Sequence, residues 1–126
     1  GDTMFAPNLG TARCDFPGGS AEQLYNTIQR FFTLPEETVV FLGHDYPKEG
    51  NEPLSTLSIK EAKETNKQIR PDVPLAEYVE KREARDATLA VPKLLLPAIQ
   101  ANLRNGQFGA PSKSGKQFIK IPVNAI

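Results

Sequence analysis

The most constraining feature of the chain is an unbroken β-favouring run, Thr38-Val39-Val40-Phe41-Leu42. Its apolar residues follow one another and do not alternate with polar ones. Such a run is typical of a strand that is buried on both faces, in a sheet covered by helices. Gly43-His44-Asp45-Tyr46 follows directly, and ligands often gather in the loops beyond the carboxyl ends of such strands. The run therefore predicts an α/β fold with a polar site at the end of this strand.

A long loop and a helix precede this strand. Residues 6–19 contain several Pro and Gly residues, and a loop of this length inside a compact domain is often functional. Ser20 and Gln23 form a capping-box pattern, which predicts a helix that starts at Ala21. Pro35 is expected to end this helix. Apolar residues at helical spacing predict that one face packs on the core, namely Leu24, Ile28, Phe31 and Phe32.

The remainder of the chain predicts shorter elements. Residues 54–59 read as a strand and residues 60–68 as a charged helix. A second amphipathic helix with a charged outer face is expected from Leu75. Pro92 and Pro97 break the next apolar stretch, so separate packed pieces are expected there. The two apolar pieces are expected at residues 94–96 and 99–103, and Asn105-Gly106 is expected to end the second one. A turn is predicted at residues 112–115 and a closing strand at residues 118–121.

Composition limits the classes of function. A chain of 126 residues can form one domain core, and we expect a single domain over residues 1–126. Fifteen basic residues balance fifteen acidic ones, which gives no electrostatic case for nucleic acid or an anionic membrane as partner. No apolar stretch is long enough for a membrane span. Cys14 stands alone, which excludes an internal disulfide and favours a reducing cytoplasm. It is either a partly buried thiol without chemistry or a neighbour of a substrate pocket.

The residues alone do not establish a metal site. His44 is the only histidine, and Asp2 lies in a short Gly-Asp-Thr turn. Either residue could be structural, His44 as a hydrogen-bonded side chain and Asp2 as a carboxylate that caps nearby backbone. A zinc or iron site needs about three or four protein ligands, and the chain has one histidine and one cysteine. Spacing by itself therefore supports no metal motif.

Several segments, taken in order, resemble one known family. Gly1-Asp2-Thr3-Met4-Phe5 is similar to the G-D-T-L-F segment of the glyoxalase II-like branch of the metallo-β-lactamase superfamily. Arg13-Cys14-Asp15-Phe16 resembles the R-x-D-F segment of its persulfide dioxygenase members, and Gly43-His44-Asp45-Tyr46 resembles the H-D-Y segment. Residues 82–88 and 101–104 resemble related bacterial hydrolases. The resemblance implies an α/β chain that forms the carboxyl-terminal half of an αββα sandwich, with the amino-terminal half absent.

The same resemblance implies roles for four residues. Asp2 matches an aspartate that binds metal in this family, and His44 matches a histidine that binds the second metal in dinuclear members. The implied cofactor is mononuclear iron or dinuclear zinc, and in the mononuclear dioxygenases this histidine lies near the iron without holding it. Tyr46 and Arg13 match residues that help to hold glutathione-type substrates. A guanidinium group suits that task because it can clamp a carboxylate, although Arg13 could instead pair with Asp15.

The resemblance leaves three hypotheses about function. The family's H-x-H-x-D-H motif has no counterpart here, so Asp2 and His44 supply at most two ligands and the metal site is expected to be incomplete. The complete protein would be a persulfide dioxygenase-like enzyme acting on a glutathione-type thiol, or a glyoxalase II-like thioester hydrolase. We expect the fragment alone to be inactive. The third hypothesis is a non-catalytic fragment that self-associates or complements a missing amino-terminal half.

Overall fold

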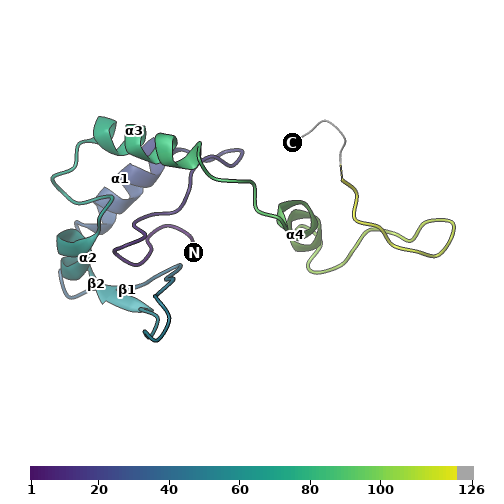
Figure 1. Cartoon of the computed structure of the whole chain (residues 1–126), viewed down its shortest axis with the longest axis horizontal. Helices are drawn as coiled ribbons and strands as arrows, with labels where there is room; N and C mark the ends of the chain where they lie inside the picture. The colour runs from purple at the N-terminus through teal and green to yellow at the C-terminus, as the bar shows by residue number, and fades with distance from the viewer. Residues whose placement is uncertain (122–126) are drawn as a thin grey trace. The chain divides into compact units, whose positions relative to one another are not determined.

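The computed structural model describes residues 1–121, which form two compact units. The first unit is Gly1–Leu89, and the second begins at Ala90. Figure 1 shows helices and a pair of strands in the first unit, in agreement with the predicted α/β class. Among the described residues, no helix combines the length and apolar character that crossing a membrane requires. A single domain over residues 1–126 stays a prediction.

Helix α1 (Ala21–Phe31) begins where the sequence predicts. The hydroxyl of Ser20 accepts a hydrogen bond of 3.2 Å from the backbone N–H of Gln23. This bond satisfies one of the N–H groups that the first turn of a helix leaves unpaired. The predicted apolar face is confirmed by two buried and two half-buried side chains, which are Ile28, Phe32, Leu24 and Phe31.

Strands β1 (Val39–Phe41) and β2 (Thr56–Ser58) form an antiparallel pair in which Val40 lies opposite Leu57. The prediction that β1 is buried on both faces is wrong. Val39 is 58% exposed and Phe41 is 81% exposed, whereas Val40 packs partly against the core. Within residues 1–121, β1 has β2 as its only strand partner, and nothing covers its outer face. A continuous apolar run can therefore predict burial on both faces of a strand even where only one face is packed.

Helix α2 (Ile59–Thr65) follows β2 without a loop. Ser58 caps it, because its hydroxyl accepts from the backbone N–H of Glu61 while the Glu61 carboxylate accepts from the backbone N–H of Ser58. This reciprocal capping box begins the helix sharply. The helix ends earlier than the predicted residue 68, because Asn66 takes an extended conformation at its end.

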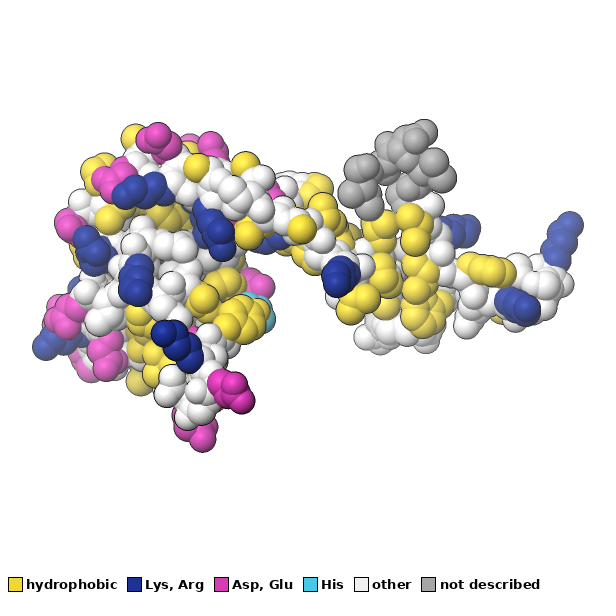
Figure 2. Space-filling view, viewed as in Figure 1, with side chains coloured by type: hydrophobic (Ala, Val, Ile, Leu, Met, Phe, Trp, Pro, Cys, Tyr) yellow, Lys and Arg dark blue, Asp and Glu magenta, His cyan; other side chains and the backbone are white. Residues whose placement is uncertain are grey.

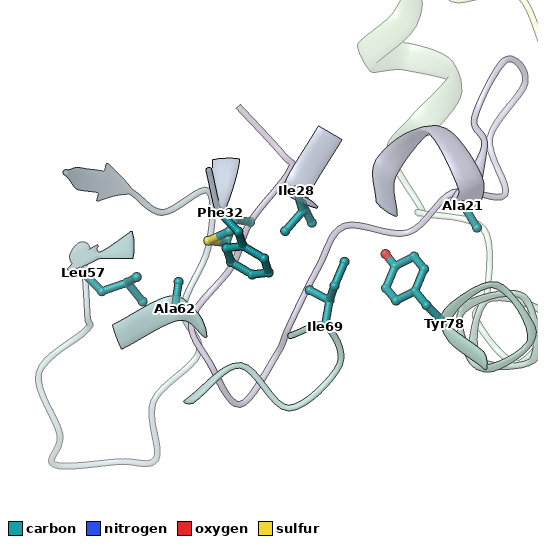
Figure 3. Close-up of a cluster of buried hydrophobic side chains, with 8 residues drawn as sticks. Ala21, Ile28, Phe32, Leu57, Ala62, Ile69 and Tyr78 are labelled. Atoms are coloured by element: carbon teal, nitrogen blue, oxygen red, sulfur yellow. The ribbon is translucent and has the colours of Figure 1, made fainter. Parts of the chain in front are cut away.

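Helix α3 (Leu75–Asp86) packs against α1 and completes the core of the first unit. Figure 3 shows the apolar side chains of that core lying between α1, the β1–β2 pair, α2 and the segment that leads to α3. Ile28, Ile69 and Tyr78 are almost completely buried there. Burial of this apolar surface is the main favourable contribution to folding of the unit.

The predicted loop at residues 6–19 is confirmed, and it is held firmly from both sides. An isolated bridge joins Met4 to Thr11. Asn66 is buried, and its amide donates to the backbone carbonyl of Gly10 at 3.1 Å. Gly10 has a φ of +82°, and a Cβ there would lie 2.3 Å from the side chain of Gln68. Glycine is thus required both by the left-handed backbone and by the close approach of this side chain.

The second unit contains helix α4 (Leu95–Asn102) and irregular chain. The prediction of two separate apolar pieces is wrong, because α4 runs through Pro97, which lies in the first turn, where a helix tolerates proline. The prediction of a strand at 118–121 is also wrong, since these residues form no strand and Phe118 is 59% exposed. The predicted stop is confirmed, because Asn105 and Gly106 both have positive φ. The turn at 112–115 is confirmed by hydrogen bonds at Ser112.

Candidate metal and substrate site

Asp2 and His44, both predicted metal ligands, lie side by side. The His44 Nε2 atom is 3.3 Å from the Asp2 Oδ1 atom, and both side chains are open to solvent. Two backbone hydrogen bonds join their segments, from Gly43 N–H to the Met4 carbonyl and from Ala6 N–H to the His44 carbonyl. A Cβ on Gly43 would lie 2.9 Å from the ring of Phe5, so glycine allows the close approach. The chain start and the loop after β1 therefore form one edge.

Aromatic rings surround the imidazole of His44. The ring of Tyr46 stacks on it, with centroids 5.6 Å apart and an angle of 16° between the planes. The ring of Phe5 meets it edge-on at 5.0 Å. These contacts fix the orientation of the imidazole while its Nε2 faces Asp2. Tyr46 is 67% exposed, so its ring is accessible at the site and could contact a bound molecule.

Arg13 is engaged by a neighbour in its own loop. Its Nε and Nη2 atoms donate to the two carboxylate oxygens of Asp15, at 2.6 Å and 2.5 Å. The guanidinium group also lies 4.7 Å above the ring of Phe16. The hydrogen bond from Arg13 holds the pKa of the Asp15 carboxyl below its usual range. The structure therefore contains the pairing that the sequence left open as an alternative, and a substrate-binding role for Arg13 stays a prediction.

The donors near Asp2 and His44 do not by themselves fit zinc or iron. Among residues 1–121, no three side chains of His, Cys, Asp or Glu lie close enough together to hold a metal ion. One imidazole nitrogen and one carboxylate give two donors, where zinc and iron sites use about three or four protein ligands. The neighbouring carboxylate of Asp45 accepts a hydrogen bond from the backbone N–H of Leu54. An incomplete ligand set stays a prediction.

Comparison with known proteins shows which proteins the chain resembles. The chain is 45% identical over 126 residues to glyoxylase B2 of Dictyostelium discoideum, and 42% identical over 126 residues to a Burkholderia pseudomallei protein named "Probable metallo-hydrolase". It is 34% identical over 91 residues, 65% of the chain, to a hydroxyacylglutathione hydrolase of Tolumonas auensis. No family profile matches the chain.

A solved structure extends the comparison to the fold. The crystal structure of ETHE1 from Myxococcus xanthus matches 84% of the chain with a TM-score of 0.69 and 36% sequence identity. The chain therefore resembles part of the metallo-β-lactamase fold, the fold of ETHE1. It corresponds to a partial, carboxyl-terminal segment of that fold, as the resemblance predicted.

The chain spans less than half the length of the metallo-β-lactamase-fold relatives that it matches. It covers 43% of glyoxylase B2, 43% of the Burkholderia protein and 34% of the hydroxyacylglutathione hydrolase. It also covers 43% of the ETHE1 chain. The name of the Burkholderia relative describes that protein as a probable metallo-hydrolase.

The residues that sequence reasoning missed lie on α3 of this metallo-β-lactamase-like segment. Arg82 and Asp86 are buried and paired, with Nη2 2.5 Å from Oδ1. The other carboxylate oxygen of Asp86 accepts from the backbone N–H of Cys14 at 2.7 Å, and Arg82 Nη1 donates to the Thr11 carbonyl at 3.3 Å. The pair therefore holds the loop that carries Arg13. A sequence signal for this pair exists, because Tyr78, Arg82 and Asp86 are each four residues apart and so share one face of the helix. That face also carries the apolar residues that pack on the core.

Cys14 is half-buried beside this pair, and it also lines a small hollow. Burial raises the pKa of its thiol, and the nearby carboxylate of Asp86 raises it further. A raised pKa lowers the fraction of nucleophilic thiolate at neutral pH. The hollow has a volume of about 280 Å³ and is bordered by Cys14, Ser20, Glu83 and Asp86 among others. The geometry therefore supports a packed, unreactive thiol at the edge of a pocket.

Proposed function

We propose that this chain is part of a metal-dependent enzyme that acts on a glutathione-derived thiol, with persulfide dioxygenase-like oxidation as the first choice. The observation that carries the proposal is the convergence of Asp2, His44 and Tyr46 at one exposed edge. These residues come from segments 1–5 and 43–46, the two that resemble the family's site segments. The likeness to a hydroxyacylglutathione hydrolase supports the substrate class.

In this proposal Asp2 and His44 belong to the metal centre. Because the described residues offer two donors, the remaining ligands come from outside this set. With a single iron, Asp2 would be a ligand and His44 a close neighbour. With two zinc ions, both would be ligands. The stacked ring of Tyr46 keeps the imidazole in place for either arrangement.

Substrate binding is assigned to Tyr46 and Arg13. The exposed ring of Tyr46 offers a contact surface beside the centre. Arg13 offers a planar fork that suits a carboxylate, of which glutathione has two. Its present carboxylate partner is Asp15, so a substrate carboxylate would compete with Asp15 for the same guanidinium hydrogens. The clamp formed by Arg82 and Asp86 fixes the backbone on which this exchange would occur.

Thioester hydrolysis of the glyoxalase II type is the second candidate. The names of the relatives favour it, because two of them are called hydrolases and one acts on a hydroxyacylglutathione. The proposed centre is the same, and the difference lies in the metal and the substrate. Two zinc ions would favour hydrolysis, and one iron would favour oxygenation.

A non-catalytic role is the third candidate. Two observations favour it, namely the two-donor set at Asp2 and His44 and the uncovered apolar face of β1 at Val39 and Phe41. Such a face is suited to packing against another polypeptide segment or a second copy of the chain. A reducing cytoplasm stays our prediction for all three candidates, because the only cysteine has no disulfide partner.

The decisive experiment compares metal content and two activities in the natural protein that contains this chain. Bound iron and zinc are quantified, and the same sample is assayed for oxygen uptake with glutathione persulfide and for hydrolysis of S-lactoylglutathione. About one equivalent of iron with oxygen uptake supports the first choice. About two equivalents of zinc with thioester hydrolysis supports the second.

Matched variants test the assigned residues. Asp2→Asn should lower metal content and activity at least tenfold, because it removes a charged ligand. Asp72→Asn makes the same chemical change at an exposed carboxylate that pairs with Arg70, and should leave both readouts unchanged. Absence of stoichiometric metal and of both activities in the natural protein would overturn the enzymatic proposal and leave the non-catalytic role.

A further inference from the structure

A basic hollow on the first unit is separate from the residues of the proposed metal centre. Its volume is about 250 Å³. Four of its six lining residues are basic and none is acidic; the six are Lys67, Gln68, Tyr78, Lys81, Arg82 and Arg85. Figure 2 shows several Lys and Arg side chains on the visible face of this unit. In a chain with no net charge, such a concentration is a local feature.

The lining residues divide into a buried floor and an exposed rim. Tyr78 and Arg82 are 1% and 5% exposed, so they form the floor. Lys67, Lys81 and Arg85 are exposed and form the rim. Two of the rim residues and the buried arginine belong to α3, whose rigid backbone fixes their spacing. A charged rim over a partly apolar floor is the arrangement of a small-ligand pocket.

The charges around the hollow do not cancel. Lys81 pairs with Glu77 at 2.5 Å, and Arg82 pairs with Asp86 at 2.5 Å. Within the described residues, Lys67 and Arg85 have no carboxylate partner. The hollow therefore keeps two uncompensated positive charges at its rim.

One buried nitrogen atom in the floor of the hollow has no hydrogen-bond acceptor among the described residues. The Nε atom of Arg82 is buried and makes no hydrogen bond to any described residue. Buried polar atoms nearly always have a partner, and each exception calls for an explanation. The other guanidinium nitrogens of Arg82 are held by Asp86, Gln68 and the Thr11 carbonyl. An anion in the hollow would sit above this cation and be attracted by it.

We propose that this hollow binds a phosphate group, either free or as the end of a phosphate monoester. A phosphate group carries about 1.5 to 2 negative charges near pH 7, which can be balanced by the two uncompensated rim charges. Its oxygens accept charge-assisted hydrogen bonds from guanidinium and ammonium groups. The volume lies below the roughly 300 Å³ at which drug-sized pockets begin, so the hollow suits a compact anion. The hollow contains none of the residues assigned to the metal centre or to substrate contact, and Arg82 is the one lining residue that also holds the Arg13 loop. The two proposals can therefore fail separately.

The test is a titration of the isotope-labelled 126-residue chain followed by two-dimensional NMR, at ionic strength held constant with sodium chloride. Inorganic phosphate should produce saturable shifts in the amides of Lys67, Lys81 and Arg85. A parallel titration with phenyl phosphate separates the two sources. Tighter binding of the ester indicates a phosphate monoester as ligand, and equal or weaker binding indicates free phosphate.

Charge-removing variants provide the controls. Arg85→Gln and Lys67→Gln should each raise the apparent Kd for phosphate about tenfold, because each removes one charge-assisted bond. Arg85→Lys keeps the charge and should recover most of the affinity. Lys60→Gln removes an exposed positive charge that does not line the hollow and should change the Kd less than about twofold. The proposal is overturned by shifts that chloride reproduces, by shifts that do not saturate, or by equal weakening in Lys60→Gln.

Discussion

Two pairs of polar side chains in the first unit differ in burial and in the number of hydrogen bonds around them. Arg82 and Asp86 are 4% exposed, their nearest atoms are 2.5 Å apart, and further hydrogen bonds surround them. Asp2 and His44 are 64% and 43% exposed, and their atoms are 3.3 Å apart. The first pair joins α3 to the loop at residues 6–19, whereas the second lies at an open edge. One pair therefore organises structure, and the other is available for ligands.

The difference follows from the cost of burying charge. A buried pair is tolerated only when its remaining hydrogen-bonding groups are satisfied, and removal of one partner leaves a charge stranded in the interior. An exposed pair is screened by water and contributes little to stability. It can exchange its partner for a metal or a substrate at small cost. The buried pair therefore contributes to stability, whereas the exposed pair is the one to which we assign the proposed metal-binding role.

The largest effect is expected from Asp86→Ala. The substitution strands the Arg82 guanidinium and removes the acceptor of the Cys14 N–H, so the free energy of unfolding should fall by about 3 to 5 kcal/mol. Chemical denaturation measures this change. Replacement of both Arg82 and Asp86 by Leu should be less harmful than Asp86→Ala, because no charge is left buried. A loss below about 1 kcal/mol for Asp86→Ala would remove the contrast between the two pairs.

The next largest loss of stability is expected from Gly10→Ala, which changes the backbone of the loop at residues 6–19. The new methyl group must enter a left-handed conformation and displace the side chain of Gln68, at a cost of about 2 to 4 kcal/mol. Gly50→Ala is the matched control, because Gly50 has a φ of +86° and no atom within 4 Å of the added Cβ. It should cost about 1 kcal/mol. Equal losses in the two variants would show that contact with Gln68 is unimportant.

The third effect concerns alkaline pH. Burial raises the pKa of Tyr78 to about 12 from 10.0, and its hydroxyl lies 2.8 Å from the Thr11 hydroxyl. The folded state therefore favours the neutral phenol. This contribution is complete below pH 10 and is lost as the pH rises toward 12, by about 2 kcal/mol in the free energy of unfolding. Tyr78→Phe should remove this part of the pH dependence, and an unchanged slope in the variant would contradict the assignment.

The smallest effect on stability is expected from Asp2→Asn. The pair with His44 is exposed, so the free energy of unfolding should change by no more than about 0.5 kcal/mol. Denaturation of the chain and of the variant under the same buffer measures the difference. A loss above about 1.5 kcal/mol would show that Asp2 is structural and would weaken its assignment to a metal centre.

Local signals predicted local structure well. The cap at Ser20 predicted the start of α1, and the positive φ values of Asn105 and Gly106 confirm the predicted stop. The family was predicted from the order of short segments, and the comparisons confirm it. The proximity of Asp2 and His44 agrees with the roles implied by that resemblance, although the roles themselves stay predictions.

Long-range features could not be read in the same way. Nothing in the run at residues 38–42 tells whether a second layer covers it, and the exposure of Phe41 depends on that layer. The predicted charged outer face of the helix from Leu75 did not distinguish Arg82 and Asp86 from its other charged residues, because charged residues on a helix usually are exposed. Their burial depends on a loop about 70 residues earlier in the chain. The alternation at 118–121 predicted a strand, but no described strand lies beside it to supply hydrogen bonds.

The contact between Asp86 and the backbone of Cys14 has a consequence for how the protein is made. The two residues are 72 positions apart, so the loop cannot take its final shape until α3 has left the ribosome. At a synthesis rate of about 5 to 20 residues per second, Asp86 leaves the ribosome roughly 4 to 14 s after Cys14 does. During that interval the thiol and the neighbouring apolar side chains are exposed to the cell. The loop therefore reaches its final shape only after α3 has been synthesised.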